Sequence, residues 1–215
     1  MRSRFGLGFL ICAAAALFLL GCTVSSVPDR AAAQESVDLP EIAQGDKGSL
    51  SDLLYKRRSV RKFGSGEMEL QEAARLLFSA QGITRQGRFR TVPSAGALYP
   101  LQIYLATGKV DGLPPGVYRY RPHKHDLLQI QEGDKREELA QAAVGQMWIA
   151  KAQAVLAVGA VFERTTSKYG KRGKRYVHIE AGGVAQSVEL QAANLGLATT
   201  VVGAFRDRRV RSLMG

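Results

Sequence analysis

The sequence predicts one α+β domain, because helical and strand patterns mix along the chain without a regular strand-helix-strand repeat. The strand pattern at 152–162 contains almost no polar residues, which is typical of a buried strand. The longest helical pattern covers 177–195, where apolar residues recur every three or four positions. The length of 215 residues leaves room for one domain of ordinary size and a tail.

Residues 1–21 have the pattern of a bacterial lipoprotein signal peptide. Arg2 and Arg4 provide a positive start, residues 5–20 are apolar and uncharged, and the four residues that end at Cys22 resemble a lipobox. The apolar run is short for a membrane span of about 20 residues. We expect cleavage before Cys22, lipidation of its thiol, and an exported protein anchored on the periplasmic or cell-surface side of a bacterial membrane. An uncleaved N-terminal anchor is the alternative.

Residues 22–49 are rich in Ala, Ser, Gln, Asp and Gly, and they predict a flexible tether. The sequence contains only two cysteines, Cys12 and Cys22. The first would leave with the signal peptide and the second would carry lipid, so no thiolate nucleophile or disulfide is expected. Any redox chemistry would then depend on a bound cofactor.

Residues 50–215 carry the pattern of the folded domain. Ser49 or Ser51 can cap a first helix near residue 50. A second helix is predicted at 69–81, with Gly82 at its end. Further strands and helices are indicated by apolar spacing, with strands at 101–107, 117–121, 126–131 and 198–202 and a helix at 134–144.

The chain is strongly basic, with 30 Lys and Arg against 19 Asp and Glu and a net charge of +11. Such a balance favours anionic partners, which include phosphorylated cofactors, acidic lipids and nucleic acid. Zinc-finger spacing, an RNA-recognition signature and a basic zipper are all absent from the sequence, so nucleic acid is not expected. The sequence instead predicts a basic surface and an anionic small ligand.

The segment Arg57-Arg58-Ser59-Val60-Arg61 places three guanidinium groups and a hydroxyl within five residues. Guanidinium groups offer forked donors that match phosphate oxygens, and a serine adds a neutral donor. Short basic runs are also common on solvated surfaces, so this motif indicates a phosphate site only together with others.

Two segments of small residues could lie against a flat ring. Residues 93–100 form a turn that leads into the strand at 101–107, and residues 195–205 repeat this design. Small side chains allow the backbone to approach a ring closely, and Ser94 can donate to a ring carbonyl or nitrogen.

Four motifs in this order, at 57–63, 93–100, 178–182 and 196–205, resemble the nitroreductase superfamily. The chain is particularly similar to the branch of SagB-type and thiazole/oxazole-forming peptide dehydrogenases. The resemblance implies a central, mostly antiparallel sheet flanked by helices, and an interlocked homodimer that holds FMN at the subunit interface. It also implies that the helix at 177–195 lies in that interface, and that a C-terminal strand of the family is missing after Gly215.

The resemblance further implies which residues hold FMN. The phosphate and ribityl end would be held by Arg57, Ser59 and Arg61. The isoalloxazine ring would lie against Pro93, Ser94 and Gly96. The opposite side of the ring system would contact Val202, Gly203 and Ala204.

The resembling peptide-dehydrogenase branch uses a Lys-Tyr pair upstream of the long helix, and Lys168-Tyr169 stands at that place. A lysine with a lowered pKa could remove a proton from an azoline-like carbon while flavin accepts a hydride. Alternatively, Lys168 belongs to a basic surface loop. Tyr99 and Tyr176 are alternative proton donors, although both could be packed residues.

A metal site is not expected, because no carboxylate at ligand spacing accompanies His123 and His125, and His178 fits a capping or packing role. The predicted function is an FMN-dependent oxidoreductase that transfers two electrons between flavin and a small organic or peptide-derived substrate, with NAD(P)H as a candidate donor. The alternative is a non-catalytic, membrane-tethered lipoprotein that binds flavin as a carrier or sensor.

Overall fold

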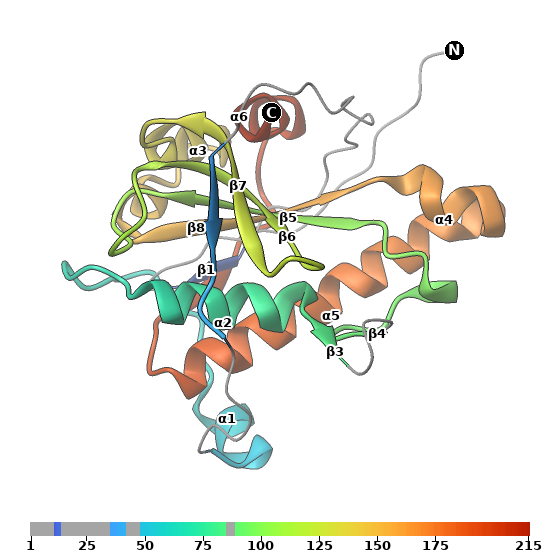
Figure 1. The fold of residues 1–215 in the computed structure, drawn as a ribbon, viewed down its shortest axis with the longest axis horizontal. Helices are drawn as coiled ribbons and strands as arrows, with labels where there is room; N and C mark the ends of the chain where they lie inside the picture. The colour runs from blue at the N-terminus through green and yellow to red at the C-terminus, as the bar shows by residue number, and fades with distance from the viewer. Residues whose placement is uncertain (1–10, 14–34, 42–47, 85–88) are drawn as a thin grey trace.

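The structure is a computed structural model that describes residues 11–13, 35–41, 48–84 and 89–215. These residues form a seven-stranded sheet and a separate two-stranded sheet, with helices around them (Figure 1). The strand order of the large sheet is β2-β7-β6-β5-β8-β1-β9, and each pair of neighbours in it is antiparallel. The predicted α+β class with a central antiparallel sheet is confirmed.

The large sheet consists of β1 (Ile11–Ala13), β2 (Ser36–Asp38), β5 (Leu101–Thr107), β6 (Gly116–Arg121), β7 (Asp126–Glu132), β8 (Ala154–Ala160) and β9 (Thr199–Val201). The small sheet pairs β3 (Ile83–Thr84) with β4 (Phe89–Arg90). The α-helices are α1 (Leu50–Lys56), α2 (Leu70–Gln81), α3 (Arg136–Ala142), α4 (Phe162–Tyr169), α5 (Gly173–Asn194) and α6 (Asp207–Met214). Short 3-10 helices form η1 (Ala95–Ala97), η2 (Met147–Lys151) and η3 (Gly170–Arg172).

Each face of the large sheet packs against its own set of helices. Alternate residues of β5 point to opposite faces, as the pleat of a strand requires. Leu101 and Ile103 join the core cluster that contains α2 and α5. Tyr104 and Ala106 join the second cluster, which contains α3 and α6. The sheet therefore separates two apolar cores, and α5 belongs to the larger one.

Most predicted elements have the expected place. The helix predicted at 69–81 is α2, and its cap, Glu69, exchanges capping-box hydrogen bonds with Glu72. Ser49 caps α1, because its side chain accepts a hydrogen bond from the Asp52 amide at 3.2 Å. The prediction that a strand continues to residue 162 is wrong. Phe162 begins α4 and is buried there, and an apolar residue at the end of a strand cannot be distinguished from one that opens a buried helix.

Two short strands lie in the N-terminal segments. Ile11–Ala13, inside the predicted signal peptide, form β1 between β8 and β9. Ser36–Asp38, inside the predicted tether, pair with β7, so the chain is ordered at those residues. Cys22 lies outside the described residues, and cleavage and lipidation at this cysteine stay predictions. Across the described ranges, no helix has the length and apolarity that a membrane crossing requires.

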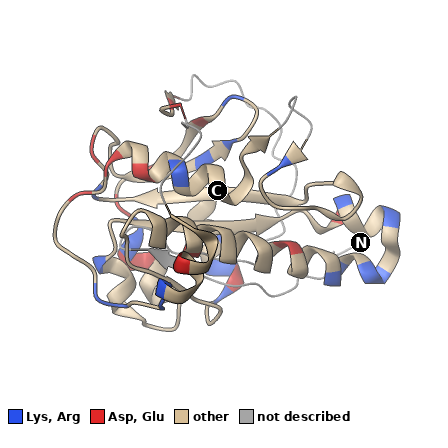
Figure 2. Ribbon diagram, turned by 90° about the horizontal axis from the view of Figure 1, so that it is seen from below, with Lys and Arg blue, Asp and Glu red and all other residues tan. Residues whose placement is uncertain are grey.

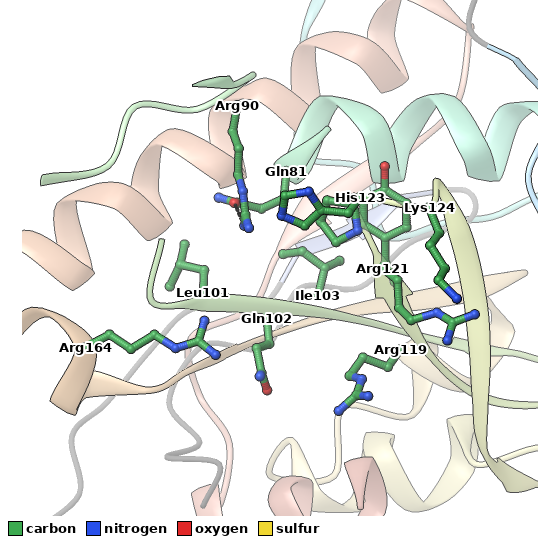
Figure 3. A pocket seen from close by; sticks show the side chains of 12 residues that line it. Gln81, Arg90, Leu101, Gln102, Ile103, Arg119, Arg121, His123, Lys124 and Arg164 are labelled. Carbon is green, nitrogen blue, oxygen red and sulfur yellow. Dashed lines mark hydrogen bonds between the residues drawn. The ribbon is translucent and has the colours of Figure 1, made fainter. Parts of the chain in front are cut away.

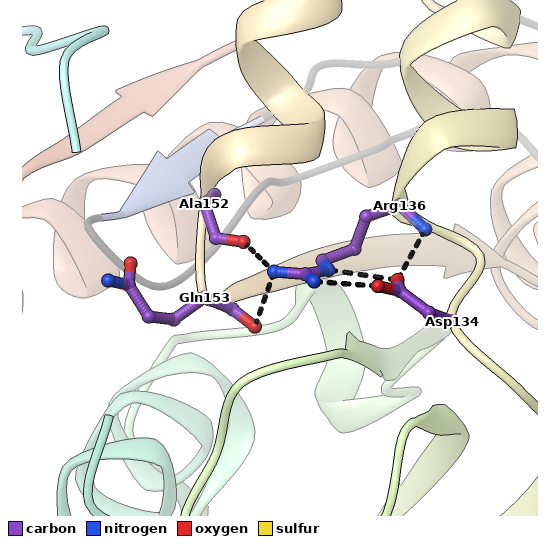
Figure 4. A network of polar contacts seen from close by, with 4 residues as sticks. All are labelled: Asp134, Arg136, Ala152 and Gln153. Atoms are coloured by element: carbon purple, nitrogen blue, oxygen red, sulfur yellow. Dashed lines mark hydrogen bonds and ion pairs between the residues drawn. The ribbon is translucent and has the colours of Figure 1, made fainter. Parts of the chain in front are cut away.

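A buried arginine holds the segment that leads into β8 (Figure 4). Arg136, only 7% exposed, donates from Nε and Nη2 to Asp134 at 2.9 and 2.6 Å, and from Nη1 to the carbonyl groups of Ala152 and Gln153. Partial burial would raise the pKa of Asp134, but the hydrogen bonds from Arg136 outweigh this effect and lower it. Gln153 Nε2 in turn donates to the carbonyl groups of Gly64 and Gly66 at 2.8 and 2.7 Å. This network connects α3, β8 and the loop that follows residue 63.

Arg136→Met should lower the free energy of unfolding by about 3 kcal/mol, because the substitution leaves buried carbonyl groups and a carboxylate without their donor. Lys135→Met is the matched control, since Lys135 makes only a part-exposed pair with Glu138 at 3.4 Å, and it should cost less than about 0.5 kcal/mol. Urea denaturation followed by circular dichroism measures both values. Equal losses in the two variants would show that the Arg136 network does not stabilise the fold.

Candidate active site

The predicted phosphate motif lies beside β9. The Val60 amide donates to the Thr199 carbonyl at 2.7 Å, and Ser59 forms a parallel bridge with Thr199. The strand β9 leads directly into Val202, Gly203 and Ala204. The structure therefore brings the first and last predicted FMN segments together, although about 140 positions separate them in the chain.

The three arginines of this motif have different surroundings. Arg57 Nη1 lies 3.5 Å from both carboxylate oxygens of Glu189 on α5. Burial raises the pKa of Glu189, and the charge of Arg57 opposes the rise. Arg58 Nη1 donates to the backbone carbonyl groups of Tyr55 and Arg57 at 2.6 and 2.7 Å, so this arginine closes the end of α1.

Arg61 and Ser59 are exposed, and the Arg61 guanidinium lies 5.7 Å from the centre of the Trp148 ring. These two side chains are therefore the accessible donors of the motif, while Arg57 already has a carboxylate partner. Gly203 and Ala204 are exposed near them. We call Ser59, Arg61 and residues 202–204 the β9 group.

The second group lies around η1, ahead of β5. Gly96 has a φ of 64°, and a Cβ atom at this position would be 2.7 Å from Tyr169 Oη and 3.1 Å from Lys168 Nζ. A side chain at residue 96 would therefore collide with the predicted catalytic pair. The predicted flavin turn, with Pro93 and Ser94, and the predicted Lys168-Tyr169 pair are thus brought together, and we call these five residues the turn group.

The backbone of this turn is strained at residues other than glycine. Ala97 and Tyr99 have φ values of 53° and 44°, which L-amino acids rarely adopt. Ser94 Oγ accepts a hydrogen bond from the Tyr99 amide at 2.9 Å, and Arg164 Nη1 donates to the Tyr99 carbonyl at 3.0 Å. The Arg90 guanidinium stacks 4.4 Å from the centre of the Tyr99 ring. These contacts fix the conformation of the turn.

The aromatic side chain of Tyr169 is fixed from two sides. Its ring makes an edge contact with Tyr176, with ring centres 5.1 Å apart. Lys168 Nζ lies 5.5 Å from the centre of the same ring. Lys and Arg gather along α4, η3 and the start of α5, which form one end of the molecule (Figure 2). The predicted basic surroundings of Lys168 are therefore present, and Lys168 also reaches the turn.

A buried carboxyl lies beneath the turn group. Glu180 of α5 is 4% exposed, and burial raises its pKa from 4.5 to about 7, against the opposing influence of Ser94, Arg90 and Gln81. Burial also lowers the pKa of Arg90, whose Nη1 donates to Gln81 Oε1 at 2.6 Å. Sequence reasoning included Glu180 only as part of a motif and missed Arg90 and Gln81, since neither belongs to a motif.

The helix α4, which carries Lys168 and Tyr169, packs at the beginning of α5 (Figure 1), whereas β9 follows the end of α5. Glu180 lies under the turn group, and Glu189 binds Arg57 next to the β9 group. Nine helical positions separate these two glutamates, which corresponds to about 13 Å along the helix axis. The described chain thus carries two half-sites, and it does not bring them into contact.

His125 and His178 have packing partners, whereas His123 is exposed. His125 lies 2.9 Å from Tyr120 Oη through Nδ1 and 3.1 Å from the Pro40 carbonyl through Nε2. The rings of His178 and Phe162 pack with centres 5.6 Å apart, and burial lowers the pKa of His178. Within the described ranges, no group of three His, Cys, Asp or Glu side chains could hold a metal ion.

A central antiparallel sheet flanked by helices is the nitroreductase-like fold that the four motifs predict. The chain belongs to the nitroreductase family, whose family model matches residues 54–215. The candidate nitroreductase MJ1384 of Methanocaldococcus jannaschii is 48% identical over 178 residues, which are 83% of this chain and 88% of that protein. Family membership indicates a flavin-dependent oxidoreductase.

Two more distant relatives support the predicted branch. The trifolitoxin operon protein TfxC of Rhizobium leguminosarum is 25% identical over 74% of this chain and 49% of its own length. The microcin B17-processing protein McbC of Escherichia coli is 28% identical over 58% of this chain and 48% of its own length. The chain therefore matches about half the length of each of these proteins.

Solved structures show the same fold. A nitroreductase homologue from Ralstonia eutropha superposes with a TM-score of 0.73 and 26% identity, over 90% of this chain and 85% of that one. A homologue from Anabaena variabilis gives a TM-score of 0.72 and 30% identity, over 85% of this chain but only 38% of that one. The nitroreductase-like fold is thus shared across nearly the whole described chain.

Glu180→Gln should change how stability depends on pH. Because the pKa of Glu180 is 4.5 when unfolded and about 7 when folded, the folded chain binds more protons between these values. The stabilising effect of the protonated carboxyl is complete below the unfolded value, and it is lost as pH rises through the folded value. From about pH 5 to about pH 8 the wild type should lose on the order of 3 kcal/mol more unfolding free energy than Glu180→Gln.

Urea denaturation at a series of pH values measures this difference. Glu163→Gln on the exposed side of α4 is the control, and it should follow the wild-type curve. Parallel curves for the wild type and Glu180→Gln would mean that Glu180 titrates like an exposed glutamate.

Proposed function

We propose that this protein is an FMN-dependent oxidoreductase that transfers two electrons, as a hydride, between flavin and a small organic or peptide-derived substrate. The observation that carries the proposal is the contact between Gly96 of the predicted flavin turn and the Lys168-Tyr169 pair. A proton-transferring lysine and tyrosine next to a ring-binding turn suit a dehydrogenation, in which one hydrogen leaves as a proton and the other as a hydride. Similarity to McbC, a microcin B17-processing protein, favours a peptide-derived substrate.

The residues present fit FMN. Arg61 and Ser59 supply exposed donors for a phosphate, and Gly203 and Ala204 leave open backbone beside them. A side chain at residue 96 would collide with Tyr169 Oη and Lys168 Nζ, so a glycine is needed for the proposed flavin turn to approach this pair. When bound, FMN would supply the two-electron chemistry that the side chains themselves lack.

The chain's own residues would orient the substrate and move a proton. Lys168 Nζ and Tyr169 Oη both border the turn, and the edge contact between the Tyr169 and Tyr176 rings holds the phenol in place. In the dehydrogenation direction Lys168 would accept the proton from the substrate carbon, and Tyr169 Oη would donate a hydrogen bond to the substrate.

A homodimer would unite the two half-sites, and we propose it for that reason. The β9 group and the turn group of one chain are separated along α5, so one flavin would use the β9 group of one protomer and the turn group of its partner. Apolar side chains suited to such an interface are exposed on α5 and α1, where Ile179, Leu54 and Tyr55 are 65%, 50% and 79% exposed.

The location of the protein is a separate proposal. The pattern of residues 1–21 and Cys22 supports an exported protein that is lipid-anchored to a bacterial membrane. NAD(P)H is scarce outside the cytoplasm, which favours oxidation of the substrate by flavin over reduction by NAD(P)H. A flavin-binding carrier or sensor without turnover is the second candidate, and it rests on the same export signal.

The variant Ser59→Ala/Arg61→Ala should weaken FMN binding by about 10- to 100-fold, because two donors to the phosphate are lost. Arg58→Ala is the control, since the guanidinium of Arg58 binds backbone carbonyl groups, and it should bind FMN within about twofold of the wild type. Quenching of flavin fluorescence measures the affinities. Wild-type affinity in the double variant would place the phosphate elsewhere.

Lys168→Ala should slow single-turnover oxidation of a model azoline peptide by at least about 100-fold, because the proton acceptor is lost. Flavin content should stay unchanged, and so should reduction of menadione by NADPH, which removes no proton from a substrate carbon. Lys171→Ala, in the same basic end, should leave all three measurements unchanged. Bleaching of the flavin absorbance follows the reaction. An equal loss of the oxidation rate in both variants would mean that Lys168 acts only as a surface charge. Wild-type protein that binds flavin without turnover would support the carrier.

A further inference from the structure

A cavity of about 410 Å³ lies where β5 and β6 diverge (Figure 3). The two strands pair from Tyr104 and Arg119 onward, toward Thr107 and Gly116. Beyond this point Leu101–Ile103 pair only with β8, and Tyr120 and Arg121 pair only with β7. The cavity occupies the fork between the strands, so we call it the fork pocket.

The walls of the fork pocket are strongly cationic. Five of the side chains that line it are basic, and no Asp or Glu lines it: Arg90, Arg119, Arg121, Lys124 and Arg164. They come from β4, from β6, from the turn after β6 and from α4, and they are therefore brought together by the fold and not by a basic run in the sequence. Figure 3 shows Arg90 on one side of β5 and Arg119 on the other.

Three of the five cations have partners that fix their positions. Arg121 forms a two-point pair with Asp126 at 2.6 and 2.5 Å. Arg90 is held by Gln81 and Tyr99, and Arg164 by the Tyr99 carbonyl. For Arg119 and Lys124, the described ranges show no ion pair. Since like charges repel, a cavity that collects these side chains becomes more favourable when an anion enters it.

The floor of the fork pocket is apolar. Leu101 and Ile103 line it from β5, and both are buried. A volume of this size suits a small organic molecule, and apolar walls with a few convergent polar groups are typical of such sites. Guanidinium groups offer paired donors that match carboxylate and phosphate oxygens.

We propose that the fork pocket binds a small organic polyanion that carries carboxylate or phosphate groups. The body of the ligand lies against Leu101 and Ile103, and its charged groups meet Arg119 and Lys124. The pocket shares no lining residue with the nine predicted FMN contacts, so it is a second site. Arg90 and Arg164 contact Tyr99, and they connect the pocket to the turn group.

The test is calorimetric titration of the full chain with citrate and, separately, with pyrophosphate. We expect saturable binding of one anion per chain for at least one of the two, and the anion that binds identifies the acidic group of the natural ligand. Arg119→Gln/Lys124→Gln should weaken this binding by at least about tenfold. Lys109→Gln/Lys151→Gln removes the same charge from exposed positions outside the pocket, and it should change the affinity by less than about twofold.

Several results would overturn the proposal. Equal weakening in the two double variants would show attraction to the whole basic surface and not to a pocket. The absence of saturable binding for both anions would show that the pocket does not bind such a ligand. Displacement of bound FMN by the anion would mean that the pocket belongs to the flavin site. Because the titration needs no flavin and no turnover, its outcome is independent of whether the proposed oxidoreductase activity is correct.

Discussion

Burial of α5 against the sheet brings two carboxyl groups into the protein interior. An ionised carboxylate costs several kcal/mol to bury without a partner. Glu189 meets this constraint by pairing with Arg57, and Glu180 meets it by taking up a proton at a pKa of about 7, near Arg90. Arg57 directly follows α1 and Arg90 lies in β4, so each carboxyl has a basic neighbour close to the candidate site. The position of α5 therefore fixes both half-sites.

The same constraint explains why the first arginine motif contains donors of two kinds. Arg57 neutralises a carboxylate of its own chain, and Arg58 closes the end of α1. Ser59 and Arg61 are left exposed beside β9, where they can meet an external phosphate. In the sequence these residues look like equivalent phosphate ligands. In the fold, Arg57 and Arg58 stabilise the structure around the site, and Ser59 and Arg61 are free to face a ligand. Substitution of Arg57 would disturb α5 as well as any bound cofactor.

The sequence predicted the elements whose apolar faces are buried, because burial imposes the period of the helix or strand. This held for α2, α5 and the strands from β5 to β8. The helix α4 was not predicted, because it is mostly polar and follows an apolar strand without a break. The pair of Arg57 and Glu189 spans 132 positions, and the contact of Gly96 with Lys168 joins separate motifs. Such long-range contacts depend on topology, which local patterns do not contain. The fork pocket could not be predicted for the same reason, because its lining residues come from separate elements.

Tyr99 connects the parts of the site that the sequence left separate. Its φ of 44° costs of the order of 1–3 kcal/mol, and such a conformation persists only where the surroundings determine it. Ser94, Arg90 and Arg164 hold its amide, ring and carbonyl, respectively. Arg164 also lines the fork pocket, and it lies one helical turn before Lys168 on α4. Arg164 therefore contributes both to the wall of the fork pocket and to the conformation of the turn that contacts the Lys168-Tyr169 pair.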